Sequence, residues 1–306
     1  MKLYYYQRPD GKFNFGDDLN YWLWPKLIPH YFDEDPETVF VGFGTLLNNL
    51  LPQRVSPAKK VLIFSTGAGY ERKLKYIPSH FKIYSVRGPY STQVLNLSPT
   101  LAITDAAILV KQCWKYGQFS RDQVSFMPHI DHATIVGEKL KKLCEEINIQ
   151  YINPAEKNLE LIFNQIDHSQ ILFTEAMHGA IVADAFRVPW VPVCSGARIL
   201  PFKWQDWCAS IQTPYQPIYL PPLAGKYPPF VKGIRSGLQV LQYWSRVAQN
   251  APFSHLKATF VSTSDEIFQD ILLKASRSGK GFLSTSARLD SLSDRLLNIL
   301  ETLQKP

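Results

Sequence analysis

Cysteine is scarce in this chain of 306 residues, and it has no long apolar run. The four cysteines lie far apart and form no Cys-x-x-Cys pair, so the sequence suggests neither a zinc site nor a disulfide framework. No hydrophobic stretch approaches the roughly 20 residues that span a bilayer, and charged residues interrupt residues 1–18. We therefore expect a cytoplasmic protein with no signal peptide and no membrane-spanning segment.

Short apolar runs alternate with amphipathic segments over the first two thirds of the chain. This β/α order predicts mostly parallel sheets covered by helices, and a hydrophobic content of 45% suffices for a large core. The pattern predicts strands at 2–6, 39–41, 61–64, 81–86, 124–126, 150–152, 171–173 and 191–194, with helices at 17–27, 89–97, 137–147, 155–166 and 177–188.

The length of the chain exceeds that of one compact domain, so we expect two domains. The predicted class is α/β, with Rossmann-like domains at 1–118 and 119–213 and a linker with a helical C-terminal extension at 214–306. Loops at the carboxyl ends of the strands would then face a common cleft, where ligands of parallel sheets bind. In the extension we expect helices at 233–247, 264–274 and 286–303.

The net charge of +7 is concentrated in one stretch of the sequence. Residues 51–87 hold eight Lys or Arg against one Glu, which equals the whole excess. Such a field suits an anionic small substrate or an anionic membrane surface, and a solvated basic face is the alternative. The stretch lacks interleaved aromatic and basic residues, so we expect no nucleic-acid partner.

Glycine turns follow the first three predicted strands. They contain Gly16 after Asn14, Gly44 at 41–45, and two glycines at 65–69. None completes a Walker or dinucleotide fingerprint. Each alone fits a tight strand-to-helix turn, but together they suggest close approach of the backbone to a ligand.

Basic side chains follow later strand ends. Arg87 stands just after the strand predicted at 81–86, where its planar guanidinium could clamp a carboxylate or phosphate through two hydrogen bonds. A surface salt bridge is the alternative for this residue. Arg198 and Lys203 add cations after the strand at 191–194.

Two histidines and an aspartate follow the strand at 124–126. A His-x-Asp-His set needs a fourth partner to bind a metal, and none is near in sequence, so we expect no metal site. We expect His129 to form hydrogen bonds in the cleft and His132 to be a plain loop residue. Trp204 and Trp207 share a helix face, which favours a core position over stacking on a sugar.

His178 lies between the apolar strand at 171–173 and a helix that Pro189 ends, so we place it in the first helical turn. There the unpaired N–H groups and the helix dipole favour an anion and disfavour a protonated imidazole. Such a histidine can work near neutral pH.

Six motifs together resemble the polysaccharide pyruvyl transferase family, in particular its exopolysaccharide branch. The resemblance extends over about residues 4–207. Its motifs are Asn-Phe-Gly-Asp at 14–17, Val-Gly-Phe-Gly-Thr at 41–45, Val-Arg-Gly-Pro at 86–89, Phe-Met-Pro-His at 126–129, Glu-Ala-Met-His-Gly at 175–179, and Phe-Lys-Trp-Gln-Asp-Trp at 202–207.

The resemblance implies a fold similar to the GT-B glycosyltransferases. It also implies transfer of a pyruvyl group from phosphoenolpyruvate to sugar hydroxyls as a ketal, without a metal or a further cofactor. The implied partner is a saccharide acceptor of exopolysaccharide or surface-glycan assembly. If this acceptor is lipid-linked, the basic stretch at 51–87 would dock the enzyme at the inner face of the membrane.

The family's essential histidine falls on His178, and the arginine of its Ser-x-Arg segment falls on Arg87 as a donor contact. Ala176 stands where many members carry an arginine before that histidine. We expect Arg198 or Lys203 to replace its charge. The segment 104–107 reads Thr-Asp-Ala-Ala where relatives tend to show Gly-Asp-Pro, which gives no support to a role for its aspartate.

The implied chemistry assigns roles to these residues. Protonation of the donor methylene makes the central carbon electrophilic, so an acid must act as the sugar hydroxyl attacks. We expect His178 to be this acid, and Glu175 or Asp17 to accept the hydroxyl proton. The expected donor-binding residues are Arg87, Arg198, Lys203, His129, Asn14, Gly16, Gly44 and Gly179.

Two other functions fit parts of the sequence. A GT-B glycosyltransferase with a nucleotide-sugar donor would use the same architecture and glycine turns, because fold does not settle chemistry. A non-catalytic protein that binds a polyanion through residues 51–87 is the second alternative.

Overall fold

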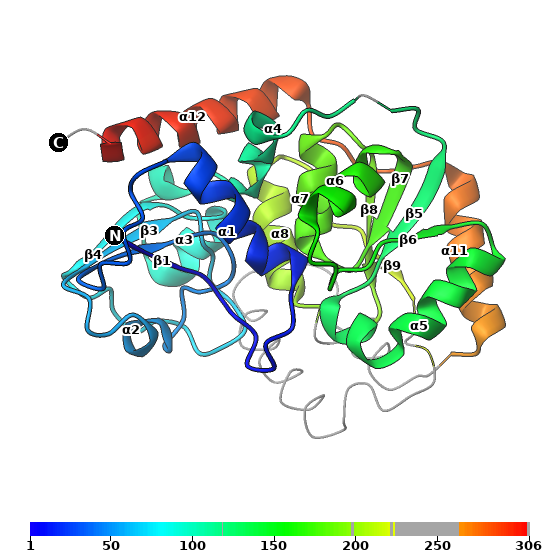
Figure 1. The fold of residues 1–306 in the computed structure, drawn as a ribbon, viewed down its shortest axis with the longest axis horizontal. Coiled ribbons are helices and arrows are strands. Elements are labelled where there is room, and N and C mark those ends of the chain that lie inside the picture. Colours follow the sequence, from blue (N-terminus) through cyan, green and yellow to red (C-terminus); the bar gives the residue numbers. More distant parts are fainter. Residues whose placement is uncertain (118, 197–198, 221–222, 224–262, 305–306) are drawn as a thin grey trace.

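Two parallel sheets lie side by side in the structure, a computed structural model that describes residues 1–117, 119–196, 199–220, 223 and 263–304 (Figure 1). The strands of the first sheet are adjacent in chain order, and every neighbouring pair is parallel. They are β1 (Lys2–Tyr4), β2 (Thr38–Val41), β3 (Lys60–Phe64) and β4 (Phe81–Ser85).

Helices cover both faces of this first sheet. Phe40 and Phe64 point to the face that carries Trp24 of α1, whereas Val41 and Ile63 point to the opposite face. The first-half helices are α1 (Phe15–Leu27), α2 (Leu51–Arg54), α3 (Pro89–Leu95) and α4 (Val110–Cys113), with short 3-10 helices η1 (Pro99–Leu101) and η2 (Ala106–Leu109).

The second sheet has the order β6-β5-β7-β8-β9, also with parallel pairs. Its strands are β5 (Gln123–Met127), β6 (Gln150–Tyr151), β7 (Ser169–Thr174), β8 (Trp190–Cys194) and β9 (Ile218–Tyr219). The chain leaves β5 to one side to form β6 and then crosses to β7 on the other side. The point between β5 and β7 is therefore a topological switch point, where such sheets bind ligands at their carboxyl ends.

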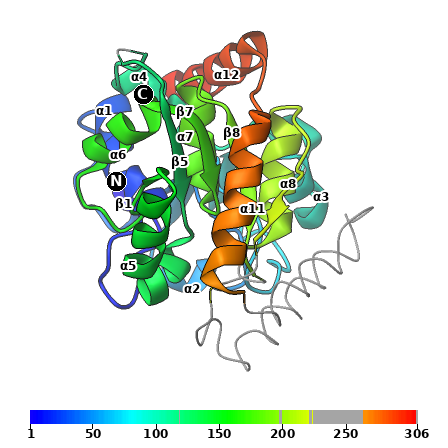
Figure 2. The same ribbon diagram turned by 90° about the vertical axis from the view of Figure 1, so that its right-hand side faces the viewer.

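The helices of the second half also cover both faces of their sheet. Phe173 packs toward α5 and α11, and Leu172 packs toward α6 and α7. Figure 2 views the sheet from the side that carries α11. These helices are α5 (Ile130–Glu146), α6 (Leu159–Asp167), α7 (Met177–Ala185), α8 (Pro201–Ser210), α11 (Asp265–Ser278) and α12 (Ser286–Gln304).

Helices α1, α7 and η2 pack against one another between the sheets. Leu19, Ile108 and Ile181 are fully buried there, in a core that includes residues of both halves. Leu292 and Leu296 of α12 join the same core. The C-terminal helix is thus an integral part of the structure, and the expected domain boundaries stay a prediction.

The structure confirms the α/β class and the predicted parallel strands up to residue 194. The Rossmann-like prediction is met only in part, because the first sheet keeps chain order and has no switch point. A short strand, β9, lies in the segment expected as a linker, and the helix predicted at 233–247 falls outside the described residues. No helix in the described part of the chain is both long and apolar enough to cross a bilayer.

Candidate active site

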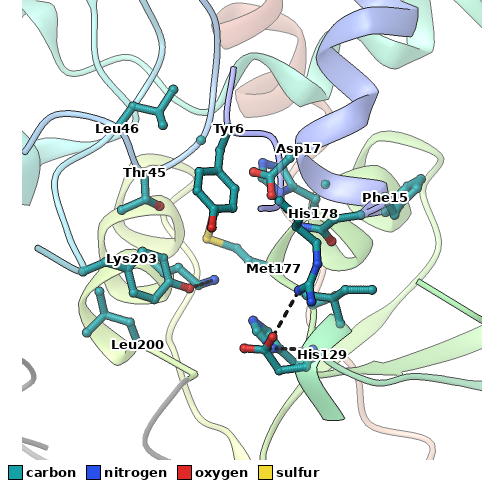
Figure 3. Close-up of a pocket in the computed structure, with 18 of the residues that line it drawn as sticks. Tyr6, Phe15, Asp17, Thr45, Leu46, His129, Met177, His178, Leu200 and Lys203 are labelled. Atoms are coloured by element: carbon teal, nitrogen blue, oxygen red, sulfur yellow. Dashed lines mark hydrogen bonds and ion pairs between the residues drawn. The ribbon is translucent and has the colours of Figure 1, made fainter. Parts of the chain in front are cut away.

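A cavity of about 320 Å³ opens where the carboxyl ends of the two sheets meet (Figure 3). Its walls come from the loops after β1, β2 and β3, from the residues after β5 and β7, and from α8. Tyr6 projects into the middle, with Lys203 on one side and Asp17 and His178 on the other. The volume lies in the range of small-ligand sites.

His178 lies in the first turn of α7, as the sequence predicts, and lines the cavity. Its ring packs 5.5 Å from the ring of Phe43, between centroids, and against the backbone of Gly16. A Cβ atom at Gly16 would lie 2.2 Å from Nδ1 of His178. The glycine turn after β1 is therefore required for the position of the histidine.

Asp105 faces the other ring nitrogen of His178. Its Oδ2 lies 3.6 Å from Nε2 of the histidine, and its Oδ1 accepts a hydrogen bond of 3.1 Å from the N–H of Ala107 at the start of η2. The Asp105 side chain is fully buried. The sequence pattern at 104–107 gives no support to a role for Asp105, because the contact with His178 depends on the packing of η2 on α7.

Asp17 lines the cavity in the first turn of α1 and accepts a hydrogen bond from Nδ2 of Asn14, which also lines it. Burial raises the pKa of Asp17 to about 6, although His178, Asn14 and Lys203 act in the opposite direction. A carboxyl group with such a pKa can accept a proton near neutral pH.

Lys203 reaches the opposite wall from α8 and is 8% exposed. Its Nζ donates a 2.6 Å hydrogen bond to the hydroxyl of Tyr70 and lies 5.1 Å from the centre of that ring. Tyr70 has a φ of 63°, a conformation that is rare for an aromatic residue and is found at functional sites. The pair places a cation and a hydroxyl together at the cavity.

A family model described as polysaccharide pyruvyl transferase matches residues 17–193, more than half of the chain. The chain belongs to the polysaccharide pyruvyl transferase family. It is also 37% identical over 238 residues to the succinoglycan biosynthesis protein ExoV of Rhizobium meliloti (strain 1021), covering 77% of this chain and 72% of that relative. No solved structure matches the chain, so the expected similarity to the GT-B fold stays a prediction.

Some of the other residues predicted from the family line the cavity, and others lie behind it. Gly44 and His129 line the cavity, and so does Ala176, where many members carry arginine. Gly179 of α7 does not line the cavity. A Cβ atom there would come within 2.6 Å of Met127 Sδ, so this glycine permits close packing of α7 against Met127. Arg198 lies outside the described residues.

Glu175 is fully buried behind the cavity and does not line it. Its carboxylate accepts the backbone N–H of His129 at 2.8 Å and lies 3.0 Å from Nδ1 of His132. Burial alone would raise the pKa of Glu175, but the charge and hydrogen bond of His132, with further hydrogen bonds, lower it. This placement suits a residue that fixes the loop after β5 and favours Asp17 as the base.

Arg87 is also fully buried and does not line the cavity. Its Nε donates to Asp206 at 3.0 Å, and its other nitrogens donate to the carbonyl oxygens of Gly44 and Ala68 and to the hydroxyl of Thr45. In this geometry the guanidinium of Arg87 faces protein groups and not the cavity, and its expected contact with the donor stays a prediction. It joins the turns after β2 and β3 to α8, which positions the cavity wall.

Arg8 and Arg54 also line the cavity, although the sequence analysis did not single them out. Arg8 forms ion pairs with two carboxylates, at 2.7 Å from Asp10 and at 3.1 Å from Asp131. Arg54 lies 5.8 Å from the centre of the Tyr6 ring. Arg8 and Tyr6 follow β1 directly, so the strand-end rule that pointed to Gly16 could have found them.

The basic stretch at 51–87 is not a uniform surface. Arg87 is buried, Arg54 lines the cavity, and Lys59 pairs with Glu37. Docking of this stretch on a membrane stays a prediction. The two tryptophans at helical spacing in α8 are fully buried, which confirms the core interpretation.

Proposed function

We propose that this protein transfers the pyruvyl group of phosphoenolpyruvate to two hydroxyls of a sugar, in the synthesis of an exopolysaccharide or related surface glycan. The observation that carries the proposal is the pairing of His178 and Asp17 on one wall of the cavity with Lys203 on the other. Membership of the family and the similarity to ExoV, a succinoglycan biosynthesis protein, support the substrate class.

Lys203 and the N-terminus of α7 would hold the anionic donor. The cation of Lys203 and the hydroxyl of Tyr70 are 2.6 Å apart, so one carboxylate or phosphate can contact both. The first N–H groups of α7 have no partner within the helix and add positive potential on the His178 side. The central carbon of the donor would then lie between the two walls.

Asp17 and His178 would carry the proton transfers. His178 delivers a proton to the methylene carbon, which becomes a methyl group, while a first sugar hydroxyl adds to the central carbon and Asp17 accepts its proton. A second hydroxyl then displaces phosphate and closes the ketal. Of the two hydroxyl protons, one replaces the proton that His178 gave and the other leaves with phosphate.

Release of inorganic phosphate from phosphoenolpyruvate, with a panel of acceptor glycans, tests this proposal. We expect acceptor-dependent release, and a loss of about 10² to 10⁴-fold in kcat for His178→Gln. His168→Gln is the control, because His168 does not line the cavity and stacks on Phe119 with 3.9 Å between ring centroids. Thermal stabilisation by nucleotide sugars, but not by phosphoenolpyruvate, would support the glycosyltransferase alternative instead.

A further inference from the structure

Asp105 and His178 leave two buried polar atoms facing each other. Oδ2 of Asp105 and Nε2 of His178 are both inaccessible to solvent, and neither has a hydrogen-bond partner among the described residues. They lie 3.6 Å apart. Leaving a buried polar atom unpaired destabilises a fold, so two such atoms that face each other require an explanation.

We propose that Asp105 is the positioning residue of the catalytic histidine: it accepts a hydrogen bond from Nε2–H of His178 and so directs Nδ1 toward the substrate. This inference rests on the proposed role of His178 as the acid. The present separation exceeds a normal N–H···O distance by about 0.5 Å, and catalytic hydrogen bonds are often long without substrate.

The surrounding structure holds both partners in place for this contact. Oδ1 of Asp105 is fixed by the N–H of Ala107, so Oδ2 is the oxygen left to face the ring. The segment η2 packs directly on α7, which carries His178. The opposite edge of the ring, with Nδ1, lies against Gly16, itself part of the cavity wall.

The carboxylate of Asp105 also opposes an unfavourable electrostatic effect of α7 on His178. An acid must carry a proton before it can deliver one, yet the N-terminus of α7 disfavours a charged imidazole. A buried carboxylate 3.6 Å from the ring favours the charged form instead. Asp17 from α1 is a second acidic group that interacts with the charge of His178.

The variant Asp105→Asn tests the proposal with little change in shape. The Asn carbonyl can still accept the N–H of Ala107, whereas its NH₂ group would donate to Nε2 of His178. The neutral ring should then carry its proton on Nδ1 instead of Nε2. In ¹⁵N-histidine spectra we expect the His178 signals, assigned by comparison with His178→Gln, to show this reversal of tautomer.

Asp184→Asn is the matched control. Asp184 is a fully buried aspartate of α7, the helix that also carries His178, and its carboxylate accepts hydrogen bonds from Trp190 and Ser284 outside the cavity. We expect it to lower the melting temperature without a change in the His178 signals. A neutral wild-type His178 protonated on Nδ1 would overturn the proposal even if Asp105→Asn failed to fold. An unchanged His178 tautomer in a folded Asp105→Asn would overturn it as well.

The proposed function has a separate test in phosphate release. If the tautomer reverses but wild type releases no phosphate from phosphoenolpyruvate with any acceptor, the pairing of Asp105 and His178 stands and the pyruvyl transfer fails. If both hold, Asp105→Asn should lower kcat by at most about 10²- to 10⁴-fold, which is the full contribution of a general acid.

Discussion

Replacement of Asp17 by asparagine should stabilise the protein and inactivate it. Asp17 lines the cavity with its carboxyl group largely out of water, held by Asn14. Burial raises its pKa from 3.8 to about 6. The folded state therefore binds the proton more tightly than the unfolded state, and ionisation of Asp17 destabilises the fold.

The magnitude follows from the size of this pKa shift. A rise of roughly two units corresponds to about 3 kcal/mol of unfolding free energy, at about 1.4 kcal/mol per unit. Below pH 3.8 the carboxyl is protonated in both states, so its proton contributes fully to stability. That contribution is lost as the pH rises toward 6 and is absent above it.

Asparagine at position 17 cannot ionise, so Asp17→Asn should match wild type near pH 4 and exceed it increasingly up to about pH 7. At about 2 °C per kcal/mol for a chain of this size, the melting temperature of Asp17→Asn should exceed that of wild type by about 6 °C when the pH is above 7. The opposing effects of His178 and Lys203 are already part of the net shift. Thermal unfolding between pH 4 and 8 measures the difference.

Phosphate release measures the predicted loss of activity in Asp17→Asn. Loss of the base should lower kcat by about 10² to 10⁴-fold. Asp18→Asn is the control for activity, because Asp18 is the next residue of α1 but does not line the cavity. A variant at Asp17 that is less stable than wild type at pH 8 would refute the burial argument, and one with wild-type turnover would refute the assignment of the base.

Three further substitutions probe the walls of the cavity. Arg87→Ala breaks a fully buried ion pair and should cost about 3 to 5 kcal/mol of unfolding free energy without substrate; wild-type stability with a raised KM for phosphoenolpyruvate would restore the contact role. Gly16→Ala puts a Cβ atom 2.2 Å from Nδ1 of His178, so kcat should fall as far as in His178→Gln, and full activity would contradict this packing. Lys203→Met should raise KM for phosphoenolpyruvate about 10-fold or more. Lys82→Met, which removes a similar lysine from a tyrosine ring outside the cavity, should leave KM unchanged.

The strand ends could be predicted from sequence because their signals are local. Apolar runs that end in Gly, His or charged residues mark the carboxyl ends of parallel strands, and these ends meet in one place. The positions of Asp17, His178 and Lys203 after strand ends predicted that they lie at one site, and all three line the same cavity. The apolar spacing also predicted the helix that carries His178 in its first turn, although α7 ends at Ala185, before Pro189.

The remaining features depend on packing between distant segments. The order of the strands decides which loops are neighbours, and alternation along the chain does not contain it. Arg87 also follows a strand end, yet it pairs with Asp206, which lies 119 residues later in the sequence. Asp105 meets His178 only because η2 packs on α7. A charged residue near a predicted site can thus support the site without touching a ligand.

The absence of an arginine at Ala176 is consistent with how charge is distributed around the cavity. Arg8 is balanced by two carboxylates, so the positive potential on its side is small. The contacts of Lys203, by contrast, are with a neutral hydroxyl and ring, and no ion pair of the described residues includes it. We therefore expect an anionic donor to bind at the side of the cavity that carries Lys203. The carboxylate of Asp131, which pairs with Arg8 and lines the cavity, can accept a hydrogen bond from a sugar hydroxyl, and this would place the acceptor at the side opposite Lys203.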